Sequence, residues 1–371
     1  MPGKSSPNQV LIRSYDECTI LPTRKCEPRN TGSGAKENPM KLKATWTALS
    51  AVALGLALAA CGGQAPTTGS ADDGDALKVG IFVDNAFGDG DFFDQAAKAE
   101  EPLKTEQGAT VETYEGQLQA QNFEPLLQDA ADANDLVFVL GFEAIDAMVK
   151  VAGENPDTTF VFIDGVVDSP EVVSAEFRTA EGCFMAGALA ATVNQSASSD
   201  TAGFIGGVNA PVIKNCESGY TQGVTAVDPD QSVAAQYAGS FVDPAKGKEI
   251  TIALGNKGAH AVFAYAGLTG AGSFNAAKSG TDVAPIGVVA DKSSLAPGKS
   301  PGTLEMGVDS VILQTAEKYA AGQLEKGTSS SFGFAEGGWA MIYDDSLVDA
   351  DQQAALENLQ QGIVDGEVTI K

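Results

Sequence analysis

Residues 78–84 read KVGIFVD, a short apolar run that ends in an aspartate. We predict a buried strand here, because short apolar runs bounded by Gly or Asp are typical of strands in parallel sheets. Similar runs follow at 136–140 (LVFVL) and 159–163 (TFVFI), with a further strand expected at 109–114. The segments between them are predicted as helices at 92–107, 122–133 and 143–153. Strands that alternate with helices in this way indicate βαβ units and an α/β fold.

The alternation begins again after residue 178. Strands are predicted at 202–206, 232–237, 262–265 and 284–289, and helices at 212–227, 244–256 and 272–279. Two αβ blocks of similar size predict two lobes that face each other across a cleft. An extra strand is expected at 172–177, a helix at 307–322 and a Gly-rich strand at 333–343. We therefore assign residues 77–177 plus 307–330 to lobe 1, and residues 178–306 plus 331–371 to lobe 2.

A different pattern precedes the first lobe. Residues 41–61 read KLKATWTALSAVALGLALAAC, in which a short basic stretch leads into an apolar run and then a cysteine. The run is too short to span a bilayer but has the length of a signal-peptide core. Its end, Leu-Ala-Ala-Cys, resembles the bacterial lipobox, which implies diacylglycerol on Cys61. We therefore predict a signal peptide at 40–60, a lipid anchor at Cys61, and a flexible Gly-, Ser- and Asp-rich tether at 61–76.

Residues 1–39 show no apolar periodicity, and signal peptides begin at the N-terminus. We interpret this segment as a start-site artefact upstream of Met40, with a disordered extension as the alternative. The whole chain has a formal net charge of −26. Nucleic acid is therefore excluded as a partner, because phosphate binding needs a basic face. The lipid, and not surface charge, would hold the protein at the membrane.

The sequence offers little for catalysis. His260 is its single histidine, and no GxSxG, HExxH or P-loop motif is present. The acidic loop after Asp84 is similar to a calcium loop, but the required Gly and Glu positions hold Asp89 and Gln95. We therefore expect no metal, no cofactor and no enzyme activity. The loop also carries Phe92 and Phe93, and we predict that it binds a planar ligand, because aromatic faces stack while carboxylates accept hydrogen bonds.

Two cysteines, Cys183 and Cys216, remain beside Cys61 in the mature chain. Outside the cytoplasm an even pair is compatible with a disulfide, and two buried free thiols are the alternative. We predict the disulfide.

Several motifs together resemble the basic membrane protein lipoproteins, the family that includes purine nucleoside receptors of the A type. The longest are GFIGGVNAPVIKNCESGY at 203–220 and QYAGSFVDPAKGKE at 236–249. Shorter ones include Phe177-Arg178, Glu181-Gly182 and Glu336-Gly-Gly338. The resemblance covers nearly all of residues 77–343. It implies a two-lobed type I periplasmic-binding-protein fold with a nucleoside site in the cleft and an ABC permease as partner.

In this family the base lies between two Phe rings, one from each lobe. The resemblance assigns these positions to Phe93 and Phe263. Together with the loop after the first strand, it gives the predicted ligand contacts: Asp84, Asn85, Phe93, Asp94, Phe142, Asp164, Phe263 and Asp291. Two positions depart from the pattern, since Val289 and Met306 stand where the family has an acid and a lysine that hold ribose.

From these observations we predict an extracytoplasmic, lipid-anchored solute-binding protein of an ABC importer. Its ligand is expected to be a purine nucleoside or a related heterocycle. A sensory receptor of the same fold and, in another class, a nucleoside-acting enzyme are the alternatives.

Overall fold

The computed structural model describes residues 76–371. The predictions for the signal peptide, the lipid-modified Cys61 and residues 1–39 lie outside the described residues. Within 76–371, no helix combines the length and the apolar character needed to cross a bilayer.

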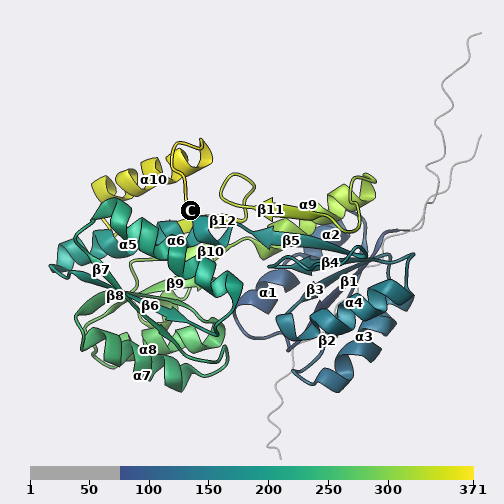
Figure 1. The fold of residues 1–371 in the computed structure, drawn as a ribbon, viewed down its shortest axis with the longest axis horizontal. Coiled ribbons are helices and arrows are strands. Elements are labelled where there is room, and N and C mark those ends of the chain that lie inside the picture. The colour runs from purple at the N-terminus through teal and green to yellow at the C-terminus, as the bar shows by residue number, and fades with distance from the viewer. Residues whose placement is uncertain (1–75) are drawn as a thin grey trace, which may run out of the picture. The chain divides into compact units, whose positions relative to one another are not determined.

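The first sheet has six strands in the order β11-β5-β4-β3-β1-β2 (Figure 1). They are β1 (Lys78–Val83), β2 (Thr110–Glu115), β3 (Leu136–Leu140), β4 (Thr159–Ile163), β5 (Val172–Phe177) and β11 (Ser329–Phe332). All neighbouring pairs in this sheet are parallel. The buried apolar runs of β1, β3 and β4 explain this, because a strand covered on both faces has no polar side.

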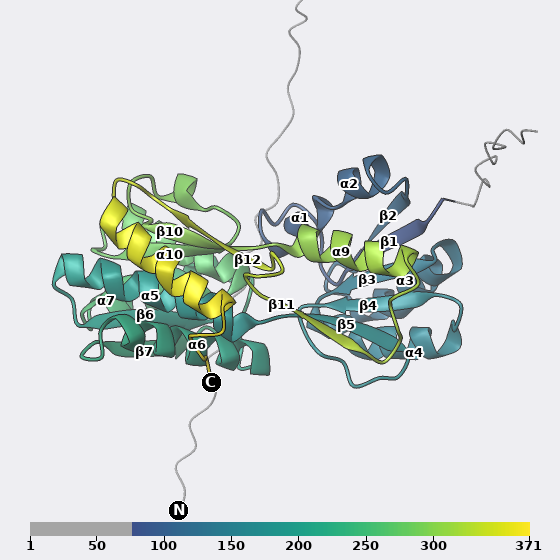
Figure 2. The same ribbon diagram turned by 90° about the horizontal axis from the view of Figure 1, so that it is seen from above.

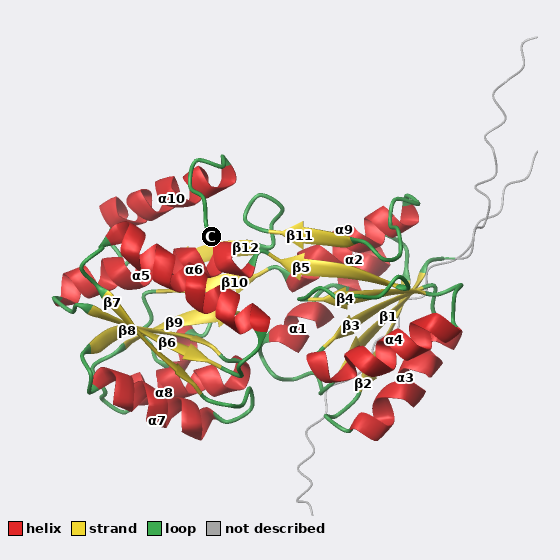
Figure 3. Ribbon diagram, viewed as in Figure 1, coloured by secondary structure: helices red, strands yellow, loops and turns green. Residues whose placement is uncertain are grey.

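Helices cover both faces of this sheet, as Figure 3 shows. They are α1 (Phe92–Ala97), α2 (Glu100–Thr105), α3 (Ala120–Ala133), the short η1 (Phe142–Ala144), α4 (Ile145–Glu154) and α9 (Val308–Ala320). Alternate residues of β1 serve the two faces. Ile81 packs in the same cluster as Leu103 of α2, whereas Phe82 packs in the cluster that holds Phe123 of α3.

The helix predicted at 92–107 is broken into α1 and α2. Pro102 is the physical reason, because proline lacks an N–H and clashes with the carbonyl four residues earlier in a continuous helix. With the break, Pro102 lies in the first turn of α2, where proline is tolerated.

The second sheet also has six strands, in the order β12-β10-β9-β8-β6-β7. They are β6 (Thr201–Gly206), β7 (Ser232–Tyr237), β8 (Ala259–Tyr265), β9 (Ala284–Val289), β10 (Gly302–Met306) and β12 (Trp339–Tyr343). Only β12 runs antiparallel, beside β10. Residues 329–343 contribute one strand to each sheet, β11 to the first and β12 to the second, as the view from above shows (Figure 2).

Helices again cover both faces of the second sheet (Figure 1). They are α5 (Thr179–Ala197), α6 (Pro211–Val227), α7 (Pro244–Gly255), η2 (Gly267–Gly270), α8 (Ala271–Lys278), η3 (Ser293–Leu295) and α10 (Ala350–Val364). Helices α5 and α6 approach closely: a Cβ added at Gly187 would lie 2.0 Å from the Tyr220 carbonyl oxygen. The predicted α/β fold of two parallel-dominated sheets is confirmed.

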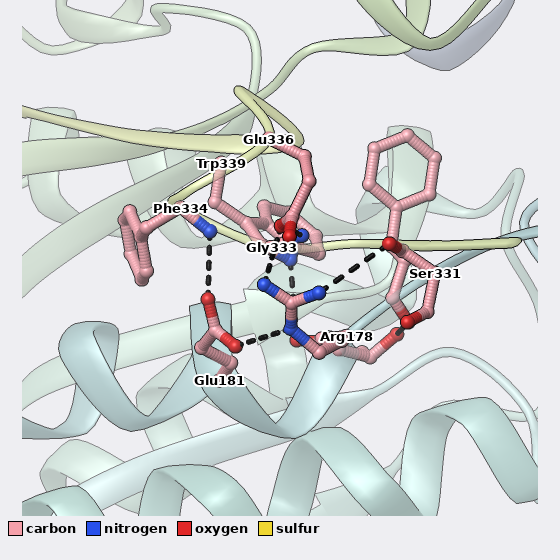
Figure 4. A network of polar contacts seen from close by, with 9 residues as sticks. Arg178, Glu181, Ser331, Gly333, Phe334, Glu336 and Trp339 are labelled. Atoms are coloured by element: carbon pink, nitrogen blue, oxygen red, sulfur yellow. Dashed lines mark hydrogen bonds and ion pairs between the residues drawn. The ribbon is translucent and has the colours of Figure 1, made fainter. Parts of the chain in front are cut away.

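Three segments join the two sheets: β5 to α5, β10 to α9, and β11 to β12. Arg178 connects the β5–α5 segment with the β11–β12 segment (Figure 4). Its guanidinium donates to the Glu181 carboxylate at 2.6 Å and also pairs with Glu336, while the Trp339 indole N–H donates to the Arg178 carbonyl at 3.2 Å. This cluster fixes the strands that lead into and out of the second lobe.

Candidate functional site

A cavity of about 340 Å³ lies between the two lobes. Most of its lining residues lie at or just after the ends of β1, β2, β3 and β4 in lobe 1 and of β6, β7, β8, β9 and β10 in lobe 2. These are carboxyl ends of parallel strands, where α/β proteins bind their ligands. The topology therefore brings residues from distant parts of the sequence to one place.

Asp84 lies at the end of β1 and faces this cavity. Its side chain is 2% exposed, and Oδ2 has no hydrogen-bond partner. Burial raises its pKa to about 8, and a hydrogen bond and the negative charge of Glu143 add to the rise. Gly141, at φ 111°, makes room for it, since a Cβ there would lie 1.9 Å from the Asp84 carboxyl carbon. Only glycine fits at this position.

Asp164 follows β4 and also lines the cavity. Its Oδ1 is buried with no hydrogen-bond partner, and burial raises its pKa to about 8. Its backbone is left-handed, with φ 70°. An unpaired carboxyl in such a conformation is a common mark of a functional position.

The loop after β1 is built by its own aspartates. The Asp89 carboxylate accepts the backbone N–H groups of Asp91, Phe93 and Asp94 at 2.9–3.2 Å. The Asp94 carboxylate accepts the N–H groups of two glycines earlier in the loop at 2.6 and 2.8 Å. Asp94 was predicted to contact ligand, but it is not among the residues that line the cavity. Its carboxylate is occupied in shaping the loop.

Aromatic side chains form much of the cavity wall. Phe92 and Phe93 both line it, with ring centroids 5.6 Å apart. Phe142 lies at the rim and is 37% exposed. Asn85, predicted from the sequence, also lines the cavity.

From lobe 2, the ring at the cavity is Phe241 and not Phe263. Phe263 is fully buried in the middle of β8 and stacks on Tyr220, with ring centroids 5.6 Å apart and an angle of 11° between the planes. Because α5 and α6 cover that face of the sheet, Phe263 cannot reach a ligand. Phe241 lies in the loop after β7, and Tyr265 at the end of β8 adds a second ring.

Asp291 is also placed away from the cavity. It is exposed, and its carboxylate accepts the N–H and the hydroxyl of Ser293 at 2.8 and 3.0 Å. Val289 and Met306, in contrast, do line the cavity. Val289 has a left-handed backbone, with φ 70°, which is strained for a β-branched residue. Its carbonyl accepts a hydrogen bond from the Gln95 side chain of lobe 1 at 3.1 Å.

Comparison with known proteins identifies the family of this chain. Residues 76–371 match the family model Bmp, described as ABC transporter substrate-binding protein PnrA-like. The chain belongs to this family.

Among its relatives, Basic membrane protein D of Borreliella burgdorferi is 30% identical over 75% of this chain and 83% of that protein. The ABC transporter nucleoside-binding protein BmpA of Lactococcus lactis is 32% identical over 63% of this chain and 70% of that protein. A solved ABC transporter solute-binding protein of Conexibacter woesei has a TM-score of 0.65 and 26% identity, with 80% of this chain and 99% of that chain covered. One from Aeropyrum pernix has a TM-score of 0.68 at 23% identity, over 79% and 92%.

These likenesses confirm the family and the periplasmic-binding-protein fold predicted from the sequence. The Bmp family consists of substrate-binding proteins of ABC transporters, which bind small molecules and permeases and are not enzymes. In the described part of this Bmp chain, no cluster of three His, Cys, Asp or Glu side chains is placed to hold a metal ion.

Contacts between the lobes complete the site of this Bmp protein. Lys292, in the loop after β9, pairs with Asp91 of lobe 1 at 2.8 Å and donates to the Val288 carbonyl at 2.6 Å. The two side chains are 9% and 2% exposed. Burial raises the pKa of Asp91, and the Lys292 charge opposes that rise. No local sequence pattern indicates this pair, because its members are 201 residues apart.

Away from the cavity, Cys183 of α5 and Cys216 of α6 are joined in a disulfide. Both are fully buried. The bond therefore links the two helices that cover one face of the second sheet.

Proposed function

We propose that this protein captures a planar heterocycle of the nucleoside type outside the cytoplasm and delivers it to the permease of an ABC importer. The observation that carries the proposal is the cavity itself, which combines aromatic faces from both lobes with unpartnered carboxylate oxygens. Flat rings stack between aromatic side chains, and buried acceptors need donors from the ligand. The name of the Lactococcus relative, a nucleoside-binding protein, supports the same class.

The ligand ring would lie between Phe93 of lobe 1 and Phe241 of lobe 2. Asp84, Asn85 and Asp164 would then receive its N–H and O–H donors. Such a ligand contacts both lobes at once, so its binding favours the state in which they are closed. That state is what a permease would detect.

The end of the cavity formed by Val289 and Met306 is apolar. Neither side chain accepts or donates strong hydrogen bonds, so a ribose placed there would gain little. We therefore expect discrimination between a nucleoside and its free base to be less than about tenfold.

We also propose that Cys61 carries the lipid that holds the protein on the outer side of the cell membrane. The apolar run that ends in Leu-Ala-Ala-Cys supports this proposal. Cys61→Ser should release the protein from membranes or leave the signal uncleaved. An unchanged intact mass and unchanged membrane partition would contradict the anchor.

The ligand proposal is tested by calorimetric titration with adenosine, guanosine, inosine and their free bases. Phe241→Ala should weaken binding by about 5- to 150-fold, because stacking of a base on one aromatic ring contributes about 1–3 kcal/mol. Leu295→Ala is the matched control, since Leu295 is an exposed apolar residue of lobe 2 that does not line the cavity. If no purine binds below millimolar concentration, the nucleoside assignment is wrong.

A further inference from the structure

The charge of the cavity lining is one-sided. The acidic and basic side chains among its lining residues are all carboxylic acids: Asp84, Asp89, Asp91, Glu143 and Asp164. No lysine, arginine or histidine is among the described residues that line it. Lys292 pairs with one of these carboxylates, Asp91, and also donates to the Val288 carbonyl. Asp84 and Asp164 therefore have no basic partner in the lining.

Three of these carboxyl groups also have an oxygen without a hydrogen bond. The buried atoms are Oδ2 of Asp84, Oδ2 of Asp91 and Oδ1 of Asp164. Asp84 and Asp91 are each only 2% exposed, so bulk water does not solvate them freely. A buried carboxylate without a partner is costly, and a cation beside it offsets part of that cost. These acceptors therefore favour a ligand with a positively charged group that donates hydrogen bonds.

The walls around these oxygens are aromatic. Phe92, Phe93, Phe142, Phe241 and Tyr265 all line the cavity. Aromatic faces carry negative electrostatic potential and attract organic cations, most strongly where water is excluded. Carboxylates and aromatic faces both favour a positively charged ligand, and both disfavour an anion.

We propose that the ligand carried by this cavity is an organic cation, namely a planar heterocycle whose positive charge is delocalised over ring and amino nitrogens. The inference rests on the proposed function, because it specifies the charge of the heterocycle in the same cavity. A protonated or N-alkylated amino-heterocycle belongs to this class. A phosphorylated or carboxylated ligand does not.

The pKa values of the lining carboxyl groups agree with this assignment. Burial raises the pKa of both Asp84 and Asp164 to about 8, so without ligand protons occupy the place of a cation. Glu143 faces Asp84 and adds its charge to the rise. A bound cation would displace those protons, and a neutral ligand would not.

Three ring-matched probes isolate the effect of charge: benzamidine as the cation, benzamide as the neutral isostere and benzoate as the anion. Each is titrated into the purified protein at about pH 7.5, by calorimetry and by ligand-observed NMR. We expect benzamidine to bind at least about tenfold more tightly than benzamide, and benzoate not to bind. Asp164→Asn should reduce the preference to less than about threefold. Asp168→Asn is the control, because Asp168 is exposed and outside the lining.

Equal binding of benzamide and benzamidine would overturn the inference, as would the absence of binding by both at millimolar concentration. The purine panel, titrated in the same series, separates this failure from that of the proposed function. If neutral purines bind and benzamidine shows no advantage, the charge assignment fails and the nucleoside-type site stands. If benzamidine is preferred and no neutral purine binds, the charge assignment stands and the nucleoside assignment fails.

Discussion

Replacement of Lys292 by methionine should destabilise the protein, because it breaks the one buried ion pair found between the two lobes in the described part of the chain. The Nζ atom lies 2.8 Å from Oδ1 of Asp91, and both side chains are almost completely buried. The other oxygen of Asp91 already lacks a partner. After the substitution, neither carboxylate oxygen of Asp91 would have a positively charged neighbour.

The magnitude follows from this geometry. Removing one member of a buried pair costs about 3–5 kcal/mol, since an uncompensated charge stays in the interior. We expect about 3 kcal/mol, at the lower end of this range, because separation of the lobes lets water reach Asp91. The double variant Asp91→Asn/Lys292→Met should recover most of the loss, because it leaves no charge buried.

Denaturant-induced unfolding of the ligand-free protein measures these free energies. Lys299→Met is the matched control, since Lys299 is an exposed lysine in the same connection and should change stability by less than about 0.5 kcal/mol. A loss below about 1 kcal/mol for Lys292→Met would show that the pair is not buried between the lobes. A double variant no more stable than the single one would refute the explanation by charge.

The loss of stability in Lys292→Met should also depend on pH. Burial raises the pKa of Asp91, the charges of Asp89 and Asp94 add to the rise, and Lys292 opposes it. Without Lys292, the folded state holds a proton that the unfolded chain releases at lower pH. The penalty in Lys292→Met should therefore be larger at neutral pH and shrink as the pH falls below 3.8, the ordinary aspartate pKa, where Asp91 becomes protonated in the unfolded chain as well.

Three further predictions concern other positions. The Asp84 pKa is raised from 3.8 to about 8 on folding, so wild-type stability should fall as the pH rises through that window. Asp84→Asn should therefore have a higher melting temperature than the wild type at about pH 8 but not at about pH 4. Val289→Asp with Met306→Lys should raise the nucleoside-over-base preference in calorimetry to at least about tenfold, and an unchanged ratio would argue against ribose at this end of the cavity. Replacing Cys183 and Cys216 by alanine should cost about 3–4 kcal/mol in denaturant unfolding, and a loss near zero would mean that the bond does not form in solution.

Much of the fold was predictable from local pattern. Strand β3 coincides with the predicted run 136–140, because a short, wholly apolar segment followed by Gly141 is typical of a buried strand in an α/β protein. The loop after β1 lines the cavity, and its position was predictable because chain topology alone brings that edge of the sheet to the cleft. Helix α10 was missed, although Asp349 and Gln352 form a capping box that marks its start.

The site itself was less predictable for a physical reason. Strand β8 is buried on both faces, so no periodicity in its sequence shows that Phe263 faces α6 and not the cleft. Phe241 lies in a loop, and the position of a loop aromatic depends on tertiary packing. The pairing of Lys292 with Asp91 likewise depends on how the two lobes meet, and local sequence contains no such information.

Native mass spectrometry tests most directly whether this cavity binds a small planar heterocycle. The wild-type protein and Phe241→Ala are each incubated with the small-molecule fraction of a bacterial extract, desalted and sprayed without denaturation. We expect a single small-molecule adduct on the wild type, released on denaturation as an ultraviolet-absorbing heterocycle, and little or none on Phe241→Ala. A wild-type mass that matches the polypeptide alone, or an adduct retained equally by Phe241→Ala, would contradict it.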